Sequence, residues 1–331
     1  MAADHTVLVT GGAGYVGSHA CLRLAEAGYR PVVYDDLSNG HEAFVQWGPL
    51  EVGDIRDRAR LAEAFARHRP VAVMHFAALI EVGESVKFPA RFYETNVGGA
   101  ANVIQAAQSA GVEAFVFSST CATYGDPVQV PMDESHRQVP LNPYGRSKLM
   151  IEQALADMDA YQGMRSTALR YFNAAGADPG GRIGERHDPE THAVPLLLQA
   201  AQGRRAGFSI FGTDYDTRDG TAVRDYVHVL DLADAHVAAL TRLLGGGASE
   251  VFNLGTGTGT TVRELIEAVK RITARDFPVD EAARRPGDAP ALVADNTKAR
   301  TMLDWSPRHS LDDIIAHAWA WHDQHEATVF G

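Results

Sequence analysis

A tyrosine and a lysine four residues apart, Tyr144 and Lys148, have residue types and a spacing suited to acid/base chemistry. On a helix, side chains four positions apart lie on one face, one turn from each other. An ammonium near a phenol favours the phenolate, so Tyr144 is predicted to be a general acid/base whose pKa Lys148 lowers. The same spacing is common on solvated helix faces, so the prediction depends on the elements around it.

The first of these elements is a strand, a glycine-rich turn and a helix at the start of the chain. Thr6–Thr10 is predicted to be a buried strand, Gly11-Gly-Ala-Gly-Tyr-Val-Gly17 a tight turn, and Ser18–Ala27 a helix. Such glycines let backbone N–H groups approach a pyrophosphate at the positive end of the helix. A second strand, Pro31–Tyr34, leads into Asp35, which is placed to accept hydrogen bonds from an adenosine ribose. A carboxylate there repels a 2′-phosphate, so the pattern predicts NAD and not NADP.

Strands and helices continue to alternate up to about residue 173. The predicted strand Ala72–Phe76 leads into Ala77-Ala78, and Ala114–Ser118 delivers Ser118, Ser119 and Thr120. Ligands of doubly wound sheets bind at the carboxyl ends of the strands, which is where these residues come. Asn142-Pro143 is predicted to open the helix of Tyr144 and Lys148. We therefore predict an α/β fold, a doubly wound parallel sheet of the Rossmann type.

Two positions in this part leave alternatives open. Asp54 follows a predicted strand end and either contacts the adenine amino group or caps the next helix. His75 lies within an apolar run and is predicted to be a packed core residue.

The second half of the chain contains further predicted elements. Val194–Gln202 and Val227–Leu243 are predicted helices, and Thr261-x-x-Glu264 is a predicted capping box. The glycines of Gly255–Gly259 imitate a second dinucleotide loop, but no acidic residue follows at the right distance. We expect residues 1–173 to form an NAD-binding domain, to which 222–256 return, and residues 174–331 a smaller mixed α/β lobe.

Composition restricts the classes of partner. The chain has 331 residues, 45% of them apolar, and a formal net charge of −12. Nucleic acid and anionic membranes both favour a basic surface, so we expect neither as a partner. No apolar run reaches transmembrane length and Met1–His5 is too short for a signal peptide, so a cytoplasmic protein is expected. Cys21 and Cys121 have no metal-ligand spacing, and the sequence predicts no metal site.

The motifs together resemble a known family. Thr10–Gly17, the strand end Ser118–Gly125, Tyr144-x-x-x-Lys148 and Leu169-Arg-Tyr-Phe-Asn173 are similar to those of the UDP-glucose 4-epimerases, in the extended short-chain dehydrogenase/reductases. The resemblance runs from about Thr6 to Trp321. It implies interconversion of UDP-glucose and UDP-galactose through a 4-keto intermediate, with NAD retained between turnovers, in a homodimer that pairs helices such as Ala101–Ala110.

The resemblance also implies roles for individual residues. Thr120, Tyr144 and Lys148 form the implied catalytic set. The implied NAD contacts are Gly11, Gly14, Tyr15, Val16, Gly17, Asp35, Asp36, Asn39, Asp54, Ile55, Phe76, Ala77, Ala78, Asn96, Ser118, Tyr144, Lys148 and Tyr171. The implied substrate contacts are Thr120, Tyr144, Asn173, His192, Phe211, Arg224, Arg285, Asp288 and Leu292.

On the substrate side, the resemblance assigns Arg224 and Arg285 to the two phosphates, where bidentate guanidinium suits the ligand. Phe211 is expected to pack on uracil, and Asp288 to bind ribose hydroxyls or orient the arginine. Leu292 stands where relatives carry Tyr or a small residue beside the sugar 2-substituent. Ile80 replaces a lysine that many relatives use to contact the cofactor, and this departure predicts a lower affinity for NAD.

Several rival functions share parts of this pattern. A 4,6-dehydratase needs an Asp-Glu pair after the strand-end Thr, but Thr120 is followed by Cys121-Ala122. An NAD-sensing scaffold without catalysis would have no need of Tyr144 together with Lys148. Epimerases of UDP-xylose, UDP-arabinose or UDP-N-acetylhexosamines share the chemistry and remain alternatives.

Overall fold

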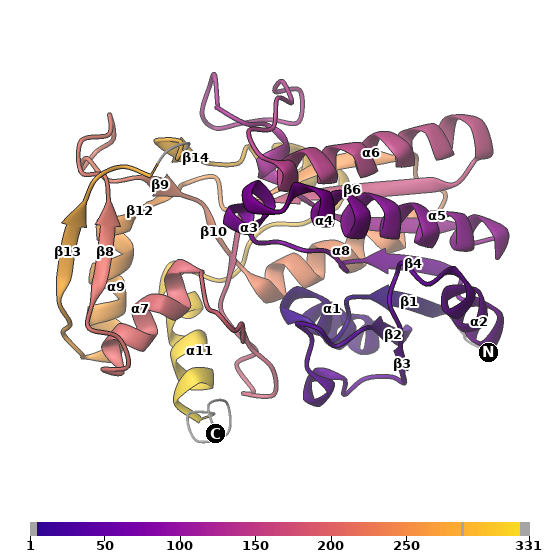
Figure 1. The fold of residues 1–331 in the computed structure, drawn as a ribbon, viewed down its shortest axis with the longest axis horizontal. Helices are drawn as coiled ribbons and strands as arrows, with labels where there is room; N and C mark the ends of the chain where they lie inside the picture. Colours follow the sequence, from indigo (N-terminus) through magenta and orange to yellow (C-terminus); the bar gives the residue numbers. More distant parts are fainter. Residues whose placement is uncertain (1–4, 286–287, 325–331) are drawn as a thin grey trace.

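The computed structural model describes residues 5–285 and 288–324, and its centre is a parallel sheet of seven strands (Figure 1). The order across the sheet is β11-β6-β5-β4-β1-β2-β3, and every neighbouring pair is parallel. The strands are β1 (Thr6–Thr10), β2 (Arg30–Asp35), β3 (Leu50–Val52), β4 (Ala72–His75), β5 (Ala114–Thr120), β6 (Arg165–Tyr171) and β11 (Glu250–Leu254). The predicted doubly wound Rossmann-type fold is confirmed.

Helices cover both faces of this sheet because its strands are apolar on both sides. Val7 and Val9 of β1 face a core shared with α1 (Tyr15–Glu26) and α8 (Val229–Leu244). Leu8 between them faces the opposite core, shared with the three helices α2 (Arg58–His68), α5 (Ala100–Ser109) and α6 (Pro143–Gln162). Alternation of side chains along a strand therefore anchors both helical layers.

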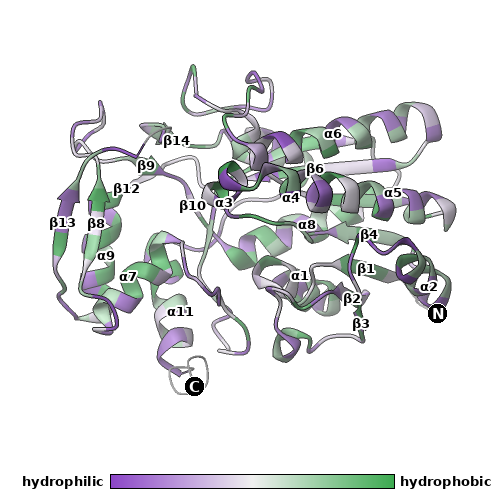
Figure 2. Cartoon of the chain, viewed as in Figure 1, coloured by the Kyte–Doolittle hydropathy of each residue, from purple (hydrophilic) through white to green (hydrophobic). Residues whose placement is uncertain are grey.

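The other half of the chain builds a smaller C-terminal lobe, on the left in Figure 1. Its third core joins α7, α9 and α11, and Figure 2 shows α7 and β8 as largely apolar. The elements here are α7 (Ala193–Ala201), β8 (Phe208–Phe211), β9 (Val223–Arg224), β12 (Thr260–Thr261), α9 (Val262–Thr273), β13 (Val279–Ala282), β14 (Ala291–Leu292) and α11 (Leu311–Gln324). Helix α10 (Thr297–Met302) instead packs on β11 of the central sheet, where Ala299 joins the core of α1 and α8. Two short strands, β7 (Asn173–Ala175) and β10 (Tyr226–His228), pair where the chain crosses between the two halves.

A short helical connection leads from β4 to α5. It consists of α3 (Val82–Lys87), α4 (Pro89–Phe92) and a π-helical segment, Tyr93–Gly99. The π-helical segment runs directly into α5, which contains most of the expected helix Ala101–Ala110. Single 3₁₀ turns follow β2 and β5, at Glu42–Phe44 and Cys121–Thr123.

Several helix ends were predicted well because their signals are local. The side chain of Asn142 caps α6, and Thr261 and Glu264 form the predicted capping box of α9. The predicted helix over Val227–Leu243 begins two residues later, at Val229. His228 is the last residue of β10, and its ring accepts the N–H of Leu230.

The second glycine-rich loop is not a nucleotide site. The carboxylate of Asp225 accepts the backbone N–H groups of Thr256 and Gly257, at 2.7 and 3.0 Å. These donors are therefore already used within the protein. Among residues 5–285 and 288–324, no helix is both long and apolar enough to cross a lipid bilayer.

Candidate active site

A cavity of about 510 Å³ opens at the carboxyl ends of the central strands, between the sheet and the C-terminal lobe. Most of the predicted cofactor and catalytic residues line it. They are Gly11, Gly14, Tyr15, Val16, Gly17, Asp35, Asp36, Asn39, Asp54, Ile55, Phe76, Ala77, Ala78, Ser118, Thr120, Tyr144, Lys148 and Tyr171. Residues far apart in the sequence meet here because parallel strands end at the same edge of the sheet.

The glycine loop has the shape that a dinucleotide requires. Gly11 has a φ of 73°, and a Cβ on it would lie 2.5 Å from the backbone N of Ala77. A Cβ on Gly17 would lie 2.2 Å from the carbonyl oxygen of Gly11, so α1 packs against the loop only without a side chain there. No side chain caps the start of α1 at Gly14, which leaves the helix N-terminus to an anion. The loop therefore fits the pyrophosphate of NAD.

Two acidic residues lie on the adenosine side of the cavity. Asp35 accepts the N–H groups of Ala13 and Leu37 at 3.0 and 2.9 Å, which fixes its carboxylate, and burial raises its pKa. Asp54 forms a paired hydrogen bond with Arg56, which lowers the pKa of the aspartate. Since Asp57 is the residue that caps α2, Asp54 does not cap it, and its carboxylate lies at the cavity wall.

Asn96 is a predicted cofactor contact that the structure does not bring to the cavity. Its buried amide binds the backbone of Leu79 at both N–H and C=O, at 2.8 and 3.0 Å, and donates to Ser147 Oγ at 3.0 Å. Asn96 thus ties the segment after β4 to α6 and acts through its neighbours. Ile80 in that segment does line the cavity, with 37% of its surface exposed.

Tyr144 and Thr120 meet at the inner end of the cavity. Asn142 Oδ1 accepts the N–H of Gly145 at 2.8 Å, and this cap places Tyr144 on the first turn of α6. Burial raises the pKa of Tyr144 well above its usual value, Tyr171 raises it further, and a hydrogen bond with Thr120 lowers it. In the protein alone, the phenol is therefore held protonated.

Lys148 lies one turn along α6, fully buried. Its Nζ donates to the carbonyl oxygen of Ser118 at 2.9 Å, and it is not a main influence on the pKa of Tyr144. Burial lowers the pKa of Lys148 to about 7, against an upward effect of Glu152. The expectation that Lys148 lowers the pKa of the tyrosine is thus not met in the protein alone, because the same burial that encloses both groups disfavours their charged forms.

Successive side chains of β5 point to opposite faces of the sheet, so the hydroxyls of Ser118, Ser119 and Thr120 have different roles. Ser118 and Thr120 face the cavity, and Ser118 Oγ lies 2.5 Å from Tyr171 Oη. Ser119 points to the other face and donates to Glu152, which pairs with Arg170 at 2.6 Å. This buried pair locks α6 to β6, so Ser119 supports the site without lining it. His75 is buried on β4 and bonds Thr10 Oγ1 at 2.6 Å, which confirms it as a core residue.

The predicted substrate residues divide into two groups. Asn173 and His192 line the cavity together with Thr120 and Tyr144. The cavity wall does not include the other five, which lie in the lobe: Phe211, Arg224, Arg285, Asp288 and Leu292.

These five residues contact one another or the nearby backbone. The Arg285 guanidinium lies 3.8 Å from the centre of the Phe211 ring. Arg224 donates to the carbonyl oxygen of Ala289 at 2.9 Å and lies 3.8 Å from Asp288. Leu292 pairs with Arg224 in the β14–β9 ladder, and its half-buried side chain packs on a core group of Tyr124, Met132, Phe172 and Ala294. Their contact with a ligand stays a prediction.

Sequence reasoning missed several residues that line the cavity on the lobe side. Among them are Glu185 and His187, which come from the loop before α7. The signal was present as Glu-x-His-x-x-Glu-x-His over residues 185–192. Glu185 Oε1 lies 2.5 Å from His192 Nδ1, and the two histidines lower the pKa of this buried carboxyl to about 2 despite the upward effect of burial.

A dinucleotide loop that shares one cavity with a Tyr/Thr/Lys group defines a nicotinamide-dependent enzyme of the short-chain dehydrogenase/reductase kind. Residues 7–255 match the model of the NAD dependent epimerase/dehydratase family. The chain belongs to this family. It is an NAD-dependent epimerase, and the resemblance predicted from its motifs is confirmed.

Similar proteins of known name agree with this assignment. The UDP-glucose 4-epimerase of Rhizobium leguminosarum bv. trifolii is 65% identical over 97% of this chain and 98% of its own length. A crystal structure of UDP-glucose 4-epimerase from Brucella ovis in complex with NAD is 50% identical, with a TM-score of 0.93, over 96% of this chain and 98% of that one. The Bifidobacterium longum UDP-glucose 4-epimerase in complex with NAD⁺ and UDP is 35% identical, with a TM-score of 0.92, over 97% of this chain and 99% of that one.

Proposed function

We propose that this protein interconverts UDP-galactose and UDP-glucose by oxidising and re-reducing carbon 4 of the sugar. The observation that carries the proposal is a single cavity that holds both a dinucleotide loop and the Thr120–Tyr144 pair, with Asn173 and His192 on its far wall. Cofactor and sugar nucleotide then meet at Tyr144. A cofactor that is both reduced and reoxidised in one turnover requires such a shared, enclosed site.

Gly11–Gly17 and Asp35 would hold NAD, which would supply a hydride acceptor for C4 and the hydride for its re-reduction. Tyr144 takes the proton of the 4-hydroxyl and returns it to O4 when the keto group is reduced from its opposite face, so its hydroxyl acts first as base and then as acid. Thr120 holds this hydroxyl through their hydrogen bond. Lys148, held by the carbonyl of Ser118, is proposed to bind the ribose hydroxyls of the cofactor. The positive charge of an oxidised nicotinamide favours the phenolate that burial alone opposes.

The sugar nucleotide is assigned to the lobe side of the cavity. Asn173 and His192 are proposed to hold the diphosphate, because both line the wall nearest the lobe. Arg224 and Arg285 are proposed to clamp the phosphates. Arg285 already covers the Phe211 ring, so uracil would pack on Phe211 only after this guanidinium moves toward the phosphate.

The residues after Thr120 argue against dehydration. Cys121 and Ala122 occupy the positions where a dehydratase needs two acids. Burial raises the pKa of the Cys121 thiol to about 12, so this group is a poor proton donor to a 6-hydroxyl. We therefore expect the 4-keto sugar to be reduced back to an alcohol and not to lose water.

The test is to incubate purified protein with UDP-galactose and no added nicotinamide nucleotide, and to quantify UDP-glucose by chromatography. We expect conversion to equilibrium from either sugar. A cofactor that remains bound after purification makes the added nucleotide unnecessary. Conversion only with added NAD would support the proposed reaction but contradict a cofactor that stays bound during purification. No conversion of either sugar would contradict the proposed substrates.

We also infer a cytoplasmic homodimer, with residues 1–173 and 222–256 forming the NAD-binding domain. The apolar side of α5, Val103 and Ile104, is buried in the core. A contact through this helix would therefore use its opposite side, with Ala101 and Gln105. Sedimentation equilibrium of the purified protein distinguishes a dimer from a monomer.

A further inference from the structure

Four side chains of one loop converge beside the cavity, where the sequence predicted no metal site. Glu185, His187, Glu190 and His192 each offer one nitrogen or oxygen atom, and all four atoms lie within 4.8 Å of one another. The loop leads into α7, for which His192 is the N-cap residue. Imidazole and carboxylate are ligands that divalent transition metals accept together.

The separations of these atoms suit a four-coordinate ion. His187 Nδ1 lies 3.4 Å from Glu185 Oε1 and 3.7 Å from Glu190 Oε2, and His192 Nδ1 lies 3.8 Å from Glu190 Oε1. Ligands about 2.0–2.2 Å from zinc in a tetrahedron are roughly 3.3–3.6 Å apart. The remaining pair, His192 Nδ1 and Glu185 Oε1, is closer at 2.5 Å because it shares a proton, which an ion would replace.

The histidine rings have an orientation that allows a shared ion. The planes of His187 and His192 are 74° apart, with ring centres separated by 5.2 Å, so both planes can pass through one point. A ring nitrogen binds a metal within the plane of its ring. An ion on the line where the two ring planes meet could be bound by both rings.

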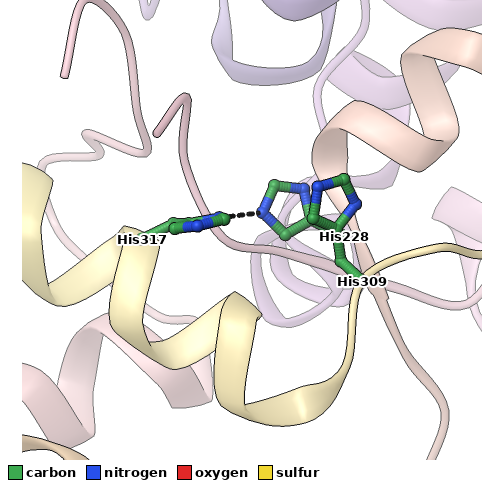
Figure 3. Close-up of side chains that lie close together, drawn as sticks. All are labelled: His228, His309 and His317. Atoms are coloured by element: carbon green, nitrogen blue, oxygen red, sulfur yellow. Dashed lines mark hydrogen bonds between the residues drawn. The ribbon is translucent and has the colours of Figure 1, made fainter. Parts of the chain in front are cut away.

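A second histidine group lacks this geometry. His228, His309 and His317 also cluster, as Figure 3 shows, but the rings of His228 and His309 are stacked 4.1 Å apart at 25°. An ion between stacked rings would lie outside both ring planes. In addition, His228 Nδ1 accepts the N–H of Leu230, so its Nε2 carries the proton and donates to His317 Nδ1. Hydrogen bonds account for this group without a metal.

Charge supports an ion in the loop. Glu185 and Glu190 are buried, with 3% and 7% of their side chains exposed, and two buried carboxylates require two positive charges. Two histidinium ions can supply them, but His187 Nδ1 then makes no well-formed hydrogen bond. One divalent cation bound by neutral histidines balances the same charge and gives this nitrogen a partner.

We propose that Glu185, His187, Glu190 and His192 form a binding site for a divalent transition metal, with Zn²⁺ as the ion that suits the ligands. Four protein ligands make a closed site, which is typical of structural zinc. The ion would fix the loop next to the glycine turn, where the His187 ring meets the Tyr15 ring edge to face at 6.4 Å. Its effect is then on stability and cofactor retention, and hydride transfer does not depend on it.

The experiment uses the full chain without an affinity tag, stripped with a chelator and dialysed against Zn²⁺ or Co²⁺. We expect one metal ion per chain by elemental analysis, an increase of the melting temperature on adding Zn²⁺, and the intense visible bands of tetrahedral Co²⁺. Because binding displaces protons, metal affinity should fall as the pH is lowered from 8 to 6. His187→Gln and Glu190→Gln should each lose the metal and the thermal shift, whereas His317→Gln in the stacked group should keep both.

Three results would overturn the proposal. The first is wild-type protein that holds no zinc after dialysis. The second is equal zinc content in wild type, His187→Gln and Glu190→Gln, which would place the ion elsewhere. The third is loss of zinc only in His317→Gln. Since the wild-type cobalt spectrum and zinc content need no variant, the proposal can fail even if a substitution prevents folding.

Discussion

Replacing the buried Lys148 by methionine should change how stability depends on pH. Burial lowers the pKa of Lys148 to about 7 from 10.5, so between these values the unfolded chain carries a proton that the folded protein lacks. The free energy of unfolding of the NAD-free protein should therefore rise with pH across this window. This gain in stability is lost again as the pH falls toward 7. The slope is about 1.4 kcal/mol per pH unit near the middle of the window. Methionine has a similar length and no proton, so the variant lacks this contribution.

The magnitude follows from the two protonation equilibria. Between pH 7 and 9, the free energy of unfolding of wild type should gain about 2 kcal/mol relative to Lys148→Met. The variant also loses the hydrogen bond to the carbonyl of Ser118, which shifts its stability by a constant amount at every pH. The titration of Lys148 is therefore measured by how the difference in unfolding free energy between wild type and variant changes with pH. The size of that difference at any one pH does not report it.

The assay is urea unfolding of protein refolded without nucleotide, at pH 7, 8 and 9. Lys87→Met is a matched control, because it makes the same substitution at a lysine whose side chain is 67% exposed instead of buried. Its unfolding free energy should follow wild type in parallel. If Lys148→Met also runs parallel to wild type from pH 7 to 9, the buried lysine keeps an ordinary pKa and the electrostatic account of the site is wrong.

Three further predictions concern turnover, cofactor and specificity. Tyr144→Phe should reduce turnover by about 10²–10⁴-fold with nucleotide binding nearly unchanged, because only the acid/base proton is lost; Tyr161→Phe, at a 79% exposed position of the same helix, should behave as wild type. Retention of more than a tenth of the wild-type rate in Tyr144→Phe would remove Tyr144 from this role. Protein purified without added nucleotide should release NAD or NADH on denaturation, even though Ile80 lacks the polar contact of a lysine; absorbance and mass spectrometry would contradict this by finding none. Wild type should prefer UDP-glucose but act measurably on UDP-N-acetylglucosamine, and Leu292→Tyr should shift the ratio of their kcat/KM values by an amount worth about 1–3 kcal/mol. An unchanged ratio would mean that Leu292 serves only the small core on which it packs.

The parts of the fold that depend on local signals could be predicted from the sequence. The strand, turn and helix over Thr6–Glu26 follow from β-branched residues and glycines that only one arrangement accommodates. The capping residues Asn142 and Thr261 likewise determine helix starts by hydrogen bonds within three residues. Because parallel strands end at one edge, placing Asp35 and Thr120 at the ends of two strands, and Tyr144 at the start of the helix after the second, was enough to bring them together.

Features that depend on distant partners could not be predicted in this way. The amide of Asn96 has the same polarity whether it faces a cofactor or the backbone of Leu79, and only the fold decides between them. Likewise, the spacing of Tyr144 and Lys148 suggested that the lysine would lower the pKa of the tyrosine. In the fold, the Nζ of Lys148 instead donates to the carbonyl oxygen of Ser118 on β5. Glu185 and His187 were missed because their loop has no periodic pattern, and their meaning comes from facing each other in space.

The most direct test of the central claim is to follow UDP-galactose with the purified protein in D₂O by proton NMR, without added nucleotide. The hydride removed from C4 should return to the same carbon, so UDP-glucose should form with its C4 proton retained and no deuterium at that position. Interconversion with deuterium at C4 would mean that the carbon exchanges a proton with solvent, and it would contradict hydride transfer at the Tyr144 cavity.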